Sequence, residues 1–575
     1  MTVATGFSSE KAAPAARQAV ATPGQWLTIG AIVAFLALFL LIPVAMVILV
    51  AFQDPNSGAF TLVNFADFAR NEMFLRSFAN SLYVSAMSVV WATIFALPLA
   101  YFTTRFEFRG AAIIQTLGVI PLIMPPFAGA VAMQLFFGRN GSVNLLLGDW
   151  FGINIPFMEG LNGVIFVQSV HYFPFILINL TASLRNIDRS MEEAAQNLGC
   201  SGGRLFRRIV FPLAMPGYVA GASLVFIKVF DDLATPLLLN VKDMLAPQAY
   251  LRITSIGLKD PMGYVISVVL IVFSVLSLFI ATSTMRNRDY ATVQRGGGGL
   301  AKRPIGGLDL VMAWGTIGLI LALVLAPHLG LLLLSFSTVW SFSVLPDGYT
   351  TAHYTRVVLE SGQYIWNTLL YATIAGFIGI IIGTAISYIV LRTKVPGRQW
   401  LDYLASAALA VPGVVLGIGY LRAYYGVSLP SGQSVTSLWI IIVIALAVRR
   451  LPYALRACMA AMQQISVSLE EAAENLGANK ASTIRKIMVP LMTGGILAGF
   501  VTSFATASVE LSATMMLVQN TSDAPLAYGL YVFMQSPAGR GAGAALGIIA
   551  VLIVGISTYL SQLLAERDRS TRAGS

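Results

Sequence analysis

Residues 191–212 read MEEAAQNLGCSGGRLFRRIVFP, and residues 469–490 read LEEAAENLGANKASTIRKIMVP. Both segments open with Glu-Glu-Ala-Ala, continue through Asn-Leu-Gly and close on proline, and both are polar stretches in a chain that is otherwise apolar. The same spacing of 278 positions also aligns residues 167–190 with 445–468, including Pro174 with Pro452. A repeat of this length indicates two fused copies of one structural unit.

The composition indicates an integral membrane protein. Of 575 residues, 57% are hydrophobic and 11% are charged, and the mean hydropathy is +0.77, whereas soluble domains are roughly a quarter charged. Cys200 and Cys458 lie in different halves without a CxxC spacing, so the sequence predicts neither a disulfide framework nor a zinc or iron–sulfur site. The net charge of +10 is attributed to cytoplasmic loops, not to nucleic-acid binding.

Apolar runs of about 20 residues can cross a bilayer as helices, and we count twelve. They are residues 27–52, 79–103, 112–137, 162–182, 215–240, 262–284, 309–337, 366–391, 402–424, 435–460, 493–518 and 541–564. The predicted fold class is therefore an all-α integral membrane protein of about twelve transmembrane helices, arranged as two pseudo-two-fold-related six-helix units, each with a cytoplasmic helix in its repeated segment.

This count divides the chain into five parts. We expect a cytoplasmic N-terminal tail (1–26), a first six-span domain (27–285), a cytoplasmic linker (286–307), a second six-span domain (308–565) and a cytoplasmic C-terminal tail (566–575). The tail at 1–26 is polar and lacks the apolar core of a signal peptide, and the linker is Gly-rich, which is typical of flexible connectors.

The distribution of Lys and Arg predicts the orientation. With the N-terminus inside the cell, 23 basic residues fall in cytoplasmic segments, 8 fall in external loops and 5 lie within or at the edges of spans. Basic residues are enriched in cytoplasmic loops, so both termini and both repeated segments are expected to face the cytoplasm.

The residue types of the repeated segment predict a short surface helix. Glutamates in a first helical turn favour the positive end of the helix dipole, and the later glycines, Gly199 and Gly477, suit a helix end that needs no Cβ. The closing prolines, Pro212 and Pro490, fit the first turn of the following membrane helix. An alternative interpretation is a helix that simply lies among lipid headgroups, but two copies at matched positions favour a more specific role.

Glu-Ala-Ala, three residues, Gly, nine residues, then Ile-x-x-Pro resembles the EAA loop of permease subunits of bacterial ABC importers. Both copies depart from the family where Leu commonly precedes the proline, with Phe211 and Val489 in its place. The fused form, with VFDDLATPLLL at 229–239 and VELSATMMLV at 509–518, is most similar to ferric-iron importer permeases, with the 2-aminoethylphosphonate and thiamine importer permeases as relatives.

The resemblance implies a location in the bacterial inner membrane and two partners, namely a homodimer of ATP-binding subunits below and a periplasmic substrate-binding protein above. ATP and magnesium would belong to the ATPase, and this chain would bind no cofactor. The coupling residues carried over by the motif are Glu192, Glu193, Ala194, Ala195, Gly199, Ile209, Pro212, Glu470, Glu471, Ala472, Ala473, Gly477, Ile487 and Pro490. The basic residues Arg204, Arg207, Arg208, Lys480, Arg485 and Lys486 could equally pair with acidic ATPase surface or with lipid phosphates.

Charged residues inside the fifth spans mark a candidate substrate pathway, because such charges usually face a cavity or a partner. Asp231 and Asp232 follow Lys228 in the first half, and Asp232 aligns with Glu510 of the second. A carboxylate from each half suits a hard cation such as ferric iron, whereas Lys228 would attract an anion such as a phosphonate or a chelated-iron complex. Alternatively, Lys228 pairs with Asp231 or Asp232 and fixes two helices, or the acids lie at an outer gate.

Other candidates rank lower. His171, His328 and His353 show no metal-binding spacing, and the helix breakers Pro125, Pro126, Pro412 and Gly413 of the third spans are interpreted as architecture. The GGGG at 296–299 is not followed by the Gly-Lys-Ser/Thr of a phosphate-binding loop, so the chain is not expected to hydrolyse ATP.

Three function classes were weighed. The leading one is the non-enzymatic permease of an importer for ferric iron, with 2-aminoethylphosphonate, thiamine or another small solute as the alternative cargo. An ion-coupled secondary transporter would also have twelve spans but needs no paired cytoplasmic motif, and a membrane-embedded enzyme would need a catalytic cluster that the sequence lacks.

Overall fold

The computed structural model describes residues 23–107, 110–286 and 304–573, and these residues fold almost entirely as helices. No β-strand occurs among them, although three isolated bridges close loops, at Gln53–Phe60, Ser337–Tyr349 and Ser428–Ser434. Most of the predicted N-terminal tail (1–22) and linker (287–303) lies outside the described residues. The predicted C-terminal tail continues helix α26 (Arg540–Ala573) as far as Ala573.

Ten of the twelve predicted spans correspond to helices long and apolar enough to cross a membrane. Eight are single spans: Pro23–Ala51, Glu72–Arg105, Gly160–Arg185, Gly202–Phe230, Pro261–Ile280, Gly307–Phe336, Ala352–Arg392 and Pro537–Leu560. Two more are bent pairs, Ala111–Ile123 with Pro126–Phe151 (bent by 104°) and Lys480–Leu491 with Thr493–Ser508 (71°). The third span of the first half is therefore broken by a sharp turn at its prolines.

The two remaining predicted spans do not match helices that are both long and apolar enough to cross a membrane. The count of twelve therefore stays a prediction. Residues 402–424 form two helices, α17 (Arg398–Ala407) and α18 (Gly413–Ala423), separated by a break at Pro412. Residues 435–460 lie in α19 (Trp439–Gln463), which is long enough to span a bilayer but holds Arg449, Arg450 and Arg456. Arginines are costly in hydrocarbon unless they face a partner or a cavity.

Each half is built around three tightly packed helices. In the first half these are α4 (Glu72–Arg105), α8 (Gly160–Arg185) and α11 (Phe211–Phe230); in the second they are α16 (Ala352–Arg392), α19 and α23 (Thr493–Ser508). The fifth spans carry matched GxxxG patterns, ending at Gly221 and Gly499. A Cβ on Gly221 would lie 2.7 Å from the Ile176 Cα of α8, and one on Gly499 would lie 3.0 Å from the Ala457 Cβ of α19. Small residues of this kind let membrane helices approach closely.

The first helix of each half packs against the other half. Helix α15 (Gly307–Phe336) contacts α4, α5 (Ala111–Val119) and α6 (Pro126–Phe137) of the first unit, while α1 (Pro23–Leu36) and α2 (Ile42–Ala51) contact α16, α17 and α18 of the second.

The contact of α1 and α2 with the second half involves a π-helical stretch at Ala37–Leu41. Such a stretch interrupts the regular pattern of backbone hydrogen bonds of an α-helix. The hydroxyls of Tyr420 and Tyr424 donate to the carbonyls of Phe39 and Leu38, each at 2.7 Å. The two halves are thus interlocked, not merely adjacent.

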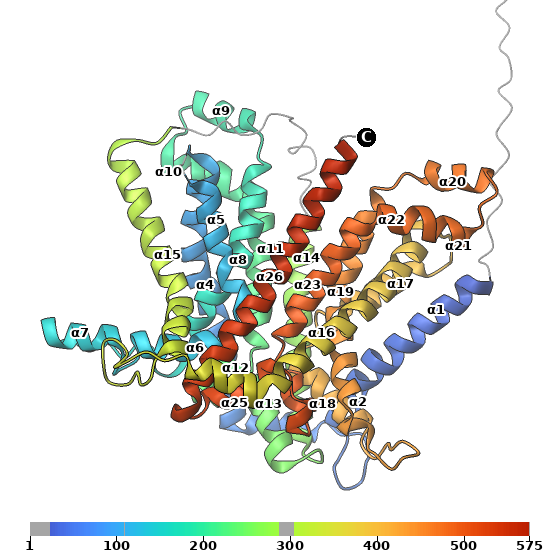
Figure 1. Cartoon of the computed structure of the whole chain (residues 1–575), viewed down its shortest axis with the longest axis horizontal. Coiled ribbons are helices and arrows are strands. Elements are labelled where there is room, and N and C mark those ends of the chain that lie inside the picture. Colours follow the sequence, from blue (N-terminus) through green and yellow to red (C-terminus); the bar gives the residue numbers. More distant parts are fainter. Residues whose placement is uncertain (1–22, 108–109, 287–303, 574–575) are drawn as a thin grey trace, which may run out of the picture.

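Helix α14 (Pro261–Arg286) is the last span of the first half. The remaining helices are short or connect the spans. They are α3 (Val63–Arg70), α7 (Ser142–Phe151), α9 (Arg189–Asn197), α10 (Gly202–Leu205), α12 (Ala234–Leu238), α13 (Leu245–Leu251), α20 (Val467–Asn475), α21 (Lys480–Thr483), α22 (Val489–Leu491), α24 (Thr514–Leu517) and α25 (Leu526–Met534). Helices α9 and α20, which contain the two Glu-Glu-Ala-Ala sequences, lie at the same end of the molecule, one above each half, whereas α12, α13 and α25 lie toward the opposite end (Figure 1).

Candidate functional site

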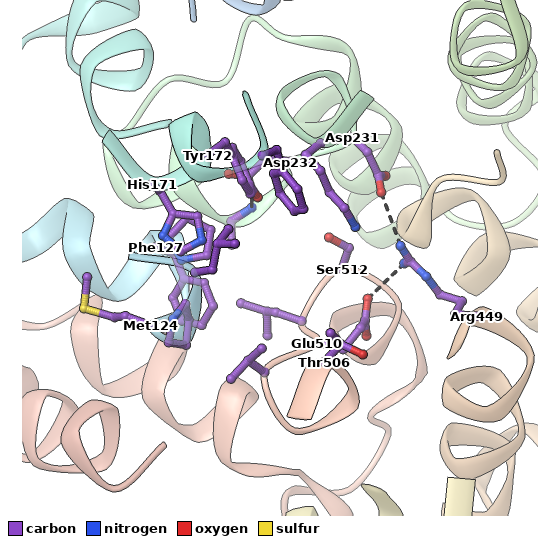
Figure 2. A pocket seen from close by; sticks show the side chains of 18 of the residues that line it. Met124, Phe127, His171, Tyr172, Asp231, Asp232, Arg449, Thr506, Glu510 and Ser512 are labelled. Atoms are coloured by element: carbon purple, nitrogen blue, oxygen red, sulfur yellow. Dashed lines mark hydrogen bonds and ion pairs between the residues drawn. The ribbon is translucent and has the colours of Figure 1, made fainter. Parts of the chain in front are cut away.

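A cavity of about 170 Å³ lies between the two halves, where the fifth spans end. Its walls come from the break between α5 and α6, from the fourth spans α8 and α19, and from the segments that follow α11 and α23. All four predicted pathway residues line it, namely Lys228, Asp231, Asp232 and Glu510. The structure therefore brings together the charged residues that the sequence singled out (Figure 2).

Asp232 is held by its own half. Helix α11 ends at Phe230, and Asp232 then caps the short helix α12: its Oδ1 accepts the amides of Ala234 (3.1 Å) and Thr235 (3.4 Å), and its Oδ2 accepts the Thr235 hydroxyl (2.5 Å). Oδ2 also accepts the Gln168 amide of α8 at 2.9 Å. The carboxylate is buried, and both its oxygens have donors within the first half.

Glu510 performs the matching role in the second half. It lies after α23, and its carboxylate accepts the amides of Ala513 (3.1 Å) and Thr514 (3.4 Å) at the start of α24. Acidic side chains at a helix start satisfy free backbone N–H groups. The alignment of Asp232 with Glu510 is thus a structural equivalence, because each carboxylate follows a fifth span and holds the start of the next short helix.

Arg449 links the two halves across the cavity. Its Nη1 donates to Glu510 Oε1 at 2.9 Å, and its Nη2 donates to Asp231 Oδ2 of the other half at 3.3 Å (Figure 2). The three side chains are 14% exposed or less. In a buried site such pairs are short-range and strongly directional, so this bridge fixes the distance between the halves at the cavity.

Gly413 completes the bridge. Its amide, the first of helix α18, donates to Asp231 at 3.0 and 3.2 Å to the two oxygens. A Cβ at this position would overlap the guanidinium of Arg449. The break at Pro412 therefore has a specific use, since it exposes a helix start beside the carboxylate of the opposite half.

The imidazoles contribute no metal centre among the described residues, where no group of three His, Cys, Asp or Glu side chains could hold an ion. His171 lines the cavity at the position equivalent to Arg449. His328 is in α15, and its two ring nitrogens are buried without a hydrogen-bond partner in the described part of the chain. The Nε2 of His353, in the first turn of α16, lies 2.9 Å from the carbonyl oxygen of Ser337.

The repeated segments form α9 and α20, and each ends at its glycine as expected. Gly199 and Gly477 have φ values of +80° and +86°. The amide of Cys200 bonds to the Ala195 carbonyl and that of Ala478 to the Ala473 carbonyl, both at 2.9 Å, which is the pairing of a Schellman motif. No atom lies within 4 Å of a Cβ built on either glycine, so backbone conformation alone demands glycine there.

The first glutamate of each segment points back into the membrane body. Glu192 pairs with Arg105 at the end of α4, and both side chains are 8% exposed or less. Glu470 pairs with Arg392 at the end of α16 at 2.5 Å, and Arg392 also donates to the carbonyls of Met462 (3.0 Å) and Ile465 (2.7 Å), which end α19. These glutamates anchor the surface helices to their own half.

Other motif residues face outward. Glu193, Ala194, Glu471 and Ala472 are exposed, whereas Ala195 and Ala473 are buried against the body. The most exposed apolar side chains at this end are Leu198 (88%) and Leu476 (89%), one residue before each glycine. The six basic residues that follow the glycines are exposed as well.

Pro212 and Pro490 lie in the first turns of α11 and α22, as predicted. The helix before Pro212 nevertheless continues without a break from Gly202 through a π-helical stretch at Phe206–Val210. The second half repeats this with Ile484–Met488 before Pro490. A π-helical turn directly before proline accommodates its missing N–H inside a continuous helix. Ile209 and Ile487 lie in these stretches and are partly buried.

Sequence reasoning missed three features of these sites. Arg449 and Gly413 were not recognised as a bridge, since their partners lie 218 and 182 positions away. Arg105 and Arg392 were not recognised as anchors, although both are the last basic residue of a second span. Leu198 and Leu476 carried a usable signal, because an apolar residue in an otherwise polar segment occurs at the same place in both copies.

Comparison with known proteins identifies relatives for the whole repeat. Residues 88–287 and 375–571 each match the family described as binding-protein-dependent transport system inner membrane component. The chain is 29% identical to the ferric transport system permease protein FbpB of Actinobacillus pleuropneumoniae over 84% of its own length and 70% of the relative. It is 30% identical to a putative ferric transport system permease protein FbpB of Haemophilus influenzae over 77% and 70%. A molybdenum transport system permease protein of Haemophilus influenzae is 35% identical over 25% of the chain and 63% of the relative.

Proposed function

The chain belongs to the family of binding-protein-dependent transport system inner membrane components, and from this premise we propose that it forms the alternating-access pathway of an ATP-driven ABC importer for ferric iron. The observation that carries the proposal is the pair of equivalent surface helices, α9 and α20, at one end of two interlocked halves (Figure 1). A pathway between two equivalent bodies, each driven at one point, is what alternating access requires.

We infer the cargo from the share of this chain that aligns with each kind of relative. The two ferric permeases align with 77–84% of the chain and so include both halves, whereas the molybdenum permease aligns with 25%. Oxygen-rich surroundings are compatible with ferric iron, a hard cation, and Asp231, Asp232 and Glu510 all line the cavity.

Force would enter through the outward faces of α9 and α20. Leu198 and Leu476 are the apolar projections that a groove on an ATPase subunit could bury, and two equal projections suit a homodimer. Glu193 and Glu471 lie on the exposed side of the same helices, with the six exposed basic residues beside them. In this scheme the chain hydrolyses nothing, and ATP with magnesium is bound by the ATPase.

The first half offers a direct mechanical path from this end to the cavity. The Arg105–Glu192 pair joins α9 to α4, and the helix from Gly202 to Phe230 then runs to Asp231. In the second half the corresponding helix bends by 71° between Leu491 and Thr493. Displacement of either surface helix would therefore move the carboxylates at the cavity.

Movement of the two halves apart must break hydrogen bonds of Arg449. This side chain bonds to Asp231 and Glu510 from opposite halves, so separation of the halves requires at least one of these bonds to break. We assign it the role of a latch that holds the present arrangement closed across the cavity.

The remaining assignments follow from the orientation. The end with α9 and α20 would face the cytoplasm of a bacterium, with both termini inside, twelve crossings of the inner membrane in total, and the periplasmic binding protein at the opposite end.

The test is reconstitution. The chain is placed with its partner ATPase and periplasmic binding protein in proteoliposomes loaded with ATP and Mg²⁺, and entry of ⁵⁵Fe supplied on the binding protein is measured. Accumulation that stops when a non-hydrolysable ATP analogue replaces ATP supports the proposal. Accumulation driven by an ion gradient without ATP would assign the chain to ion-coupled transport, and uptake of labelled molybdate with no iron uptake would overturn the cargo.

A further inference from the structure

The cavity between the halves carries three cationic side chains as well as three carboxylates. Lys228 comes from α11, and Arg449 and Arg450 are consecutive residues of α19. Formal charges therefore balance, but the two sets differ in how their atoms are used.

The carboxylates have little capacity left for a metal ion. Asp231 accepts from Arg449 and from the Gly413 amide, and Asp232 accepts four hydrogen bonds within its half. Glu510 accepts from Arg449 and from two amides of α24. A bare ferric ion would have to displace these donors and would meet the guanidinium of Arg449 at the same oxygens.

Two of the three cationic side chains, in contrast, lack a carboxylate partner among the described residues. Within the described residues, neither Lys228 nor Arg450 has a carboxylate oxygen within 4 Å, although both line the cavity. Arg450 is only 7% exposed, and its Nε has no hydrogen-bond partner in the part of the chain described. Tyr453, which hydrogen-bonds this guanidinium, provides a phenol and no carboxylate.

Arg450 is buried and Lys228 is half-buried, and cations in such positions without a paired anion are costly and mark functional positions inside membranes. Arginine in particular matches carboxylate and phosphate oxygens with its planar array of N–H donors. The free donors of the cavity are therefore suited to an anion, and its free acceptors are few. The volume of about 170 Å³ far exceeds the roughly 10–15 Å³ that one water molecule needs, so it leaves room for a metal ion with a few small ligands.

We propose that iron crosses this cavity as an anionic complex that keeps small carboxylate- or phosphate-bearing ligands, and that Lys228 and Arg450 bind those ligands. The inference rests on the proposed function, because it takes ferric iron as the cargo. It differs from a pathway of bare carboxylates in assigning recognition to the cations and in reserving Asp231 and Glu510 for the Arg449 latch.

A double-label uptake experiment tests this directly. Proteoliposomes containing the full importer receive ⁵⁵Fe either with ¹⁴C-citrate or with ³²P-phosphate, and both labels are counted inside. Entry of ⁵⁵Fe together with at least one of the two anions in a constant ratio is expected, and the two arms distinguish a carboxylate from a phosphate ligand. ATP-dependent entry of ⁵⁵Fe with neither anion would overturn the inference while leaving the proposed function intact. Absence of any ATP-dependent ⁵⁵Fe entry would instead overturn the proposed function.

Substitutions provide a second, independent readout. Lys228→Met and Arg450→Met are each expected to lower ⁵⁵Fe uptake about tenfold, which corresponds to roughly 1.4 kcal/mol, and Lys228→Arg should restore most of it. Lys259→Met, at an exposed lysine of the same half outside the cavity, serves as the matched control. ATP hydrolysis and elution as a monodisperse complex establish that each variant is folded. Full uptake by folded Lys228→Met and Arg450→Met complexes would refute the anion-binding role.

Discussion

The two halves are nearly identical at the end that carries α9 and α20 and different where they meet each other. At α9 and α20 the same features recur in place, namely an anchored glutamate, an exposed leucine and a left-handed glycine. At the cavity, equivalent positions carry unlike side chains: His171 corresponds to Arg449, Tyr172 to Arg450, and Lys228 to Thr506.

This contrast separates two demands on a duplicated chain. A pair of identical motor subunits would require two identical contact surfaces, so both copies must keep the same helix and the same helix end. A single central cavity has no such requirement, because one cargo contacts both halves at once. Asymmetry can therefore accumulate at the cavity, and Arg449 bridging to Asp231 is its clearest product.

Of the substitutions proposed, replacement of Arg449 should have the largest effect, because it destabilises the cavity between the two halves. Arg449→Met leaves the buried carboxylates of Asp231 and Glu510 without their cation, and breaking a buried pair costs about 3–5 kcal/mol. We expect a large drop in the thermal unfolding temperature of the detergent-purified protein and loss of uptake. His171→Met, at the equivalent position of the first half, should change stability far less. Equal unfolding temperatures for the two variants would show that the bridge does not hold the halves together.

The symmetric region is tested by replacing both left-handed glycines. Valine at positions 199 and 477 meets no atom, but a left-handed conformation costs about 1–2 kcal/mol per non-glycine residue, so α9 and α20 should lose their ends. Gly199→Val/Gly477→Val is expected to abolish uptake while the membrane domain remains folded.

Gly58→Val is the control for this pair, since Gly58 also has a positive φ of +68° and open space but lies in a loop outside the repeated segments. Normal transport by the double variant would mean that the glycines do not shape a coupling surface.

Substitution of the two equivalent carboxylates, Asp232 and Glu510, should lower the free energy of unfolding by smaller and unequal amounts. Glu510→Gln removes the partner of Arg449 and is expected to destabilise the protein by about 1–3 kcal/mol. Asp232→Asn keeps the length and an oxygen that can accept the α12 amides, and Asp232 has no ion pair to lose, so its effect should be smaller. Chemical denaturation of the two single variants measures the difference, and a larger loss for Asp232→Asn would contradict the geometry. If the double variant moves iron normally, the two carboxylates have no part in the pathway.

The smallest effect concerns the exposed leucines. Leu198→Ser and Leu476→Ser are each expected to weaken retention of the ATPase by about 1 kcal/mol and to leave the unfolding temperature unchanged, because neither side chain is buried. The two single variants should behave alike, unlike the cavity variants. Leu345→Ser, at a residue that is 59% exposed and lies between α15 and α16, controls for general loss of surface hydrophobicity. Retention as strong as in the unsubstituted protein would remove the leucines from the proposed interface.

Much of this arrangement could be predicted from sequence because the relevant signals are local. Apolar length located ten of the spans, and the repeated Asn-Leu-Gly located both helix ends. The alignment of Asp232 with Glu510 predicted a shared cavity because the spacing of 278 holds through the fourth and fifth spans.

Other features escaped prediction for physical reasons. The spacing changes to 287 in the earlier spans, which pairs Arg105 with Arg392 and Pro126 with Gly413, so a search at one fixed spacing missed both. The break in the third span also differs in chemistry, because Pro126 lacks the N–H that Gly413 donates to Asp231. Contacts between halves, such as Arg449 with Asp231, depend on how the units dock and leave no local pattern.

The exchanged first helices impose an order on biosynthesis. Helices α1 and α2 leave the ribosome long before α16 and α18, their packing partners, have been made, while α6 waits for α15 from the second half. A chain ended after Arg286 would expose the α6 surface to lipid or to quality-control proteases, and co-expression of residues 304–575 should rescue it. Synthesis of both halves in one chain therefore supplies each half with the helix of the other half that packs against it.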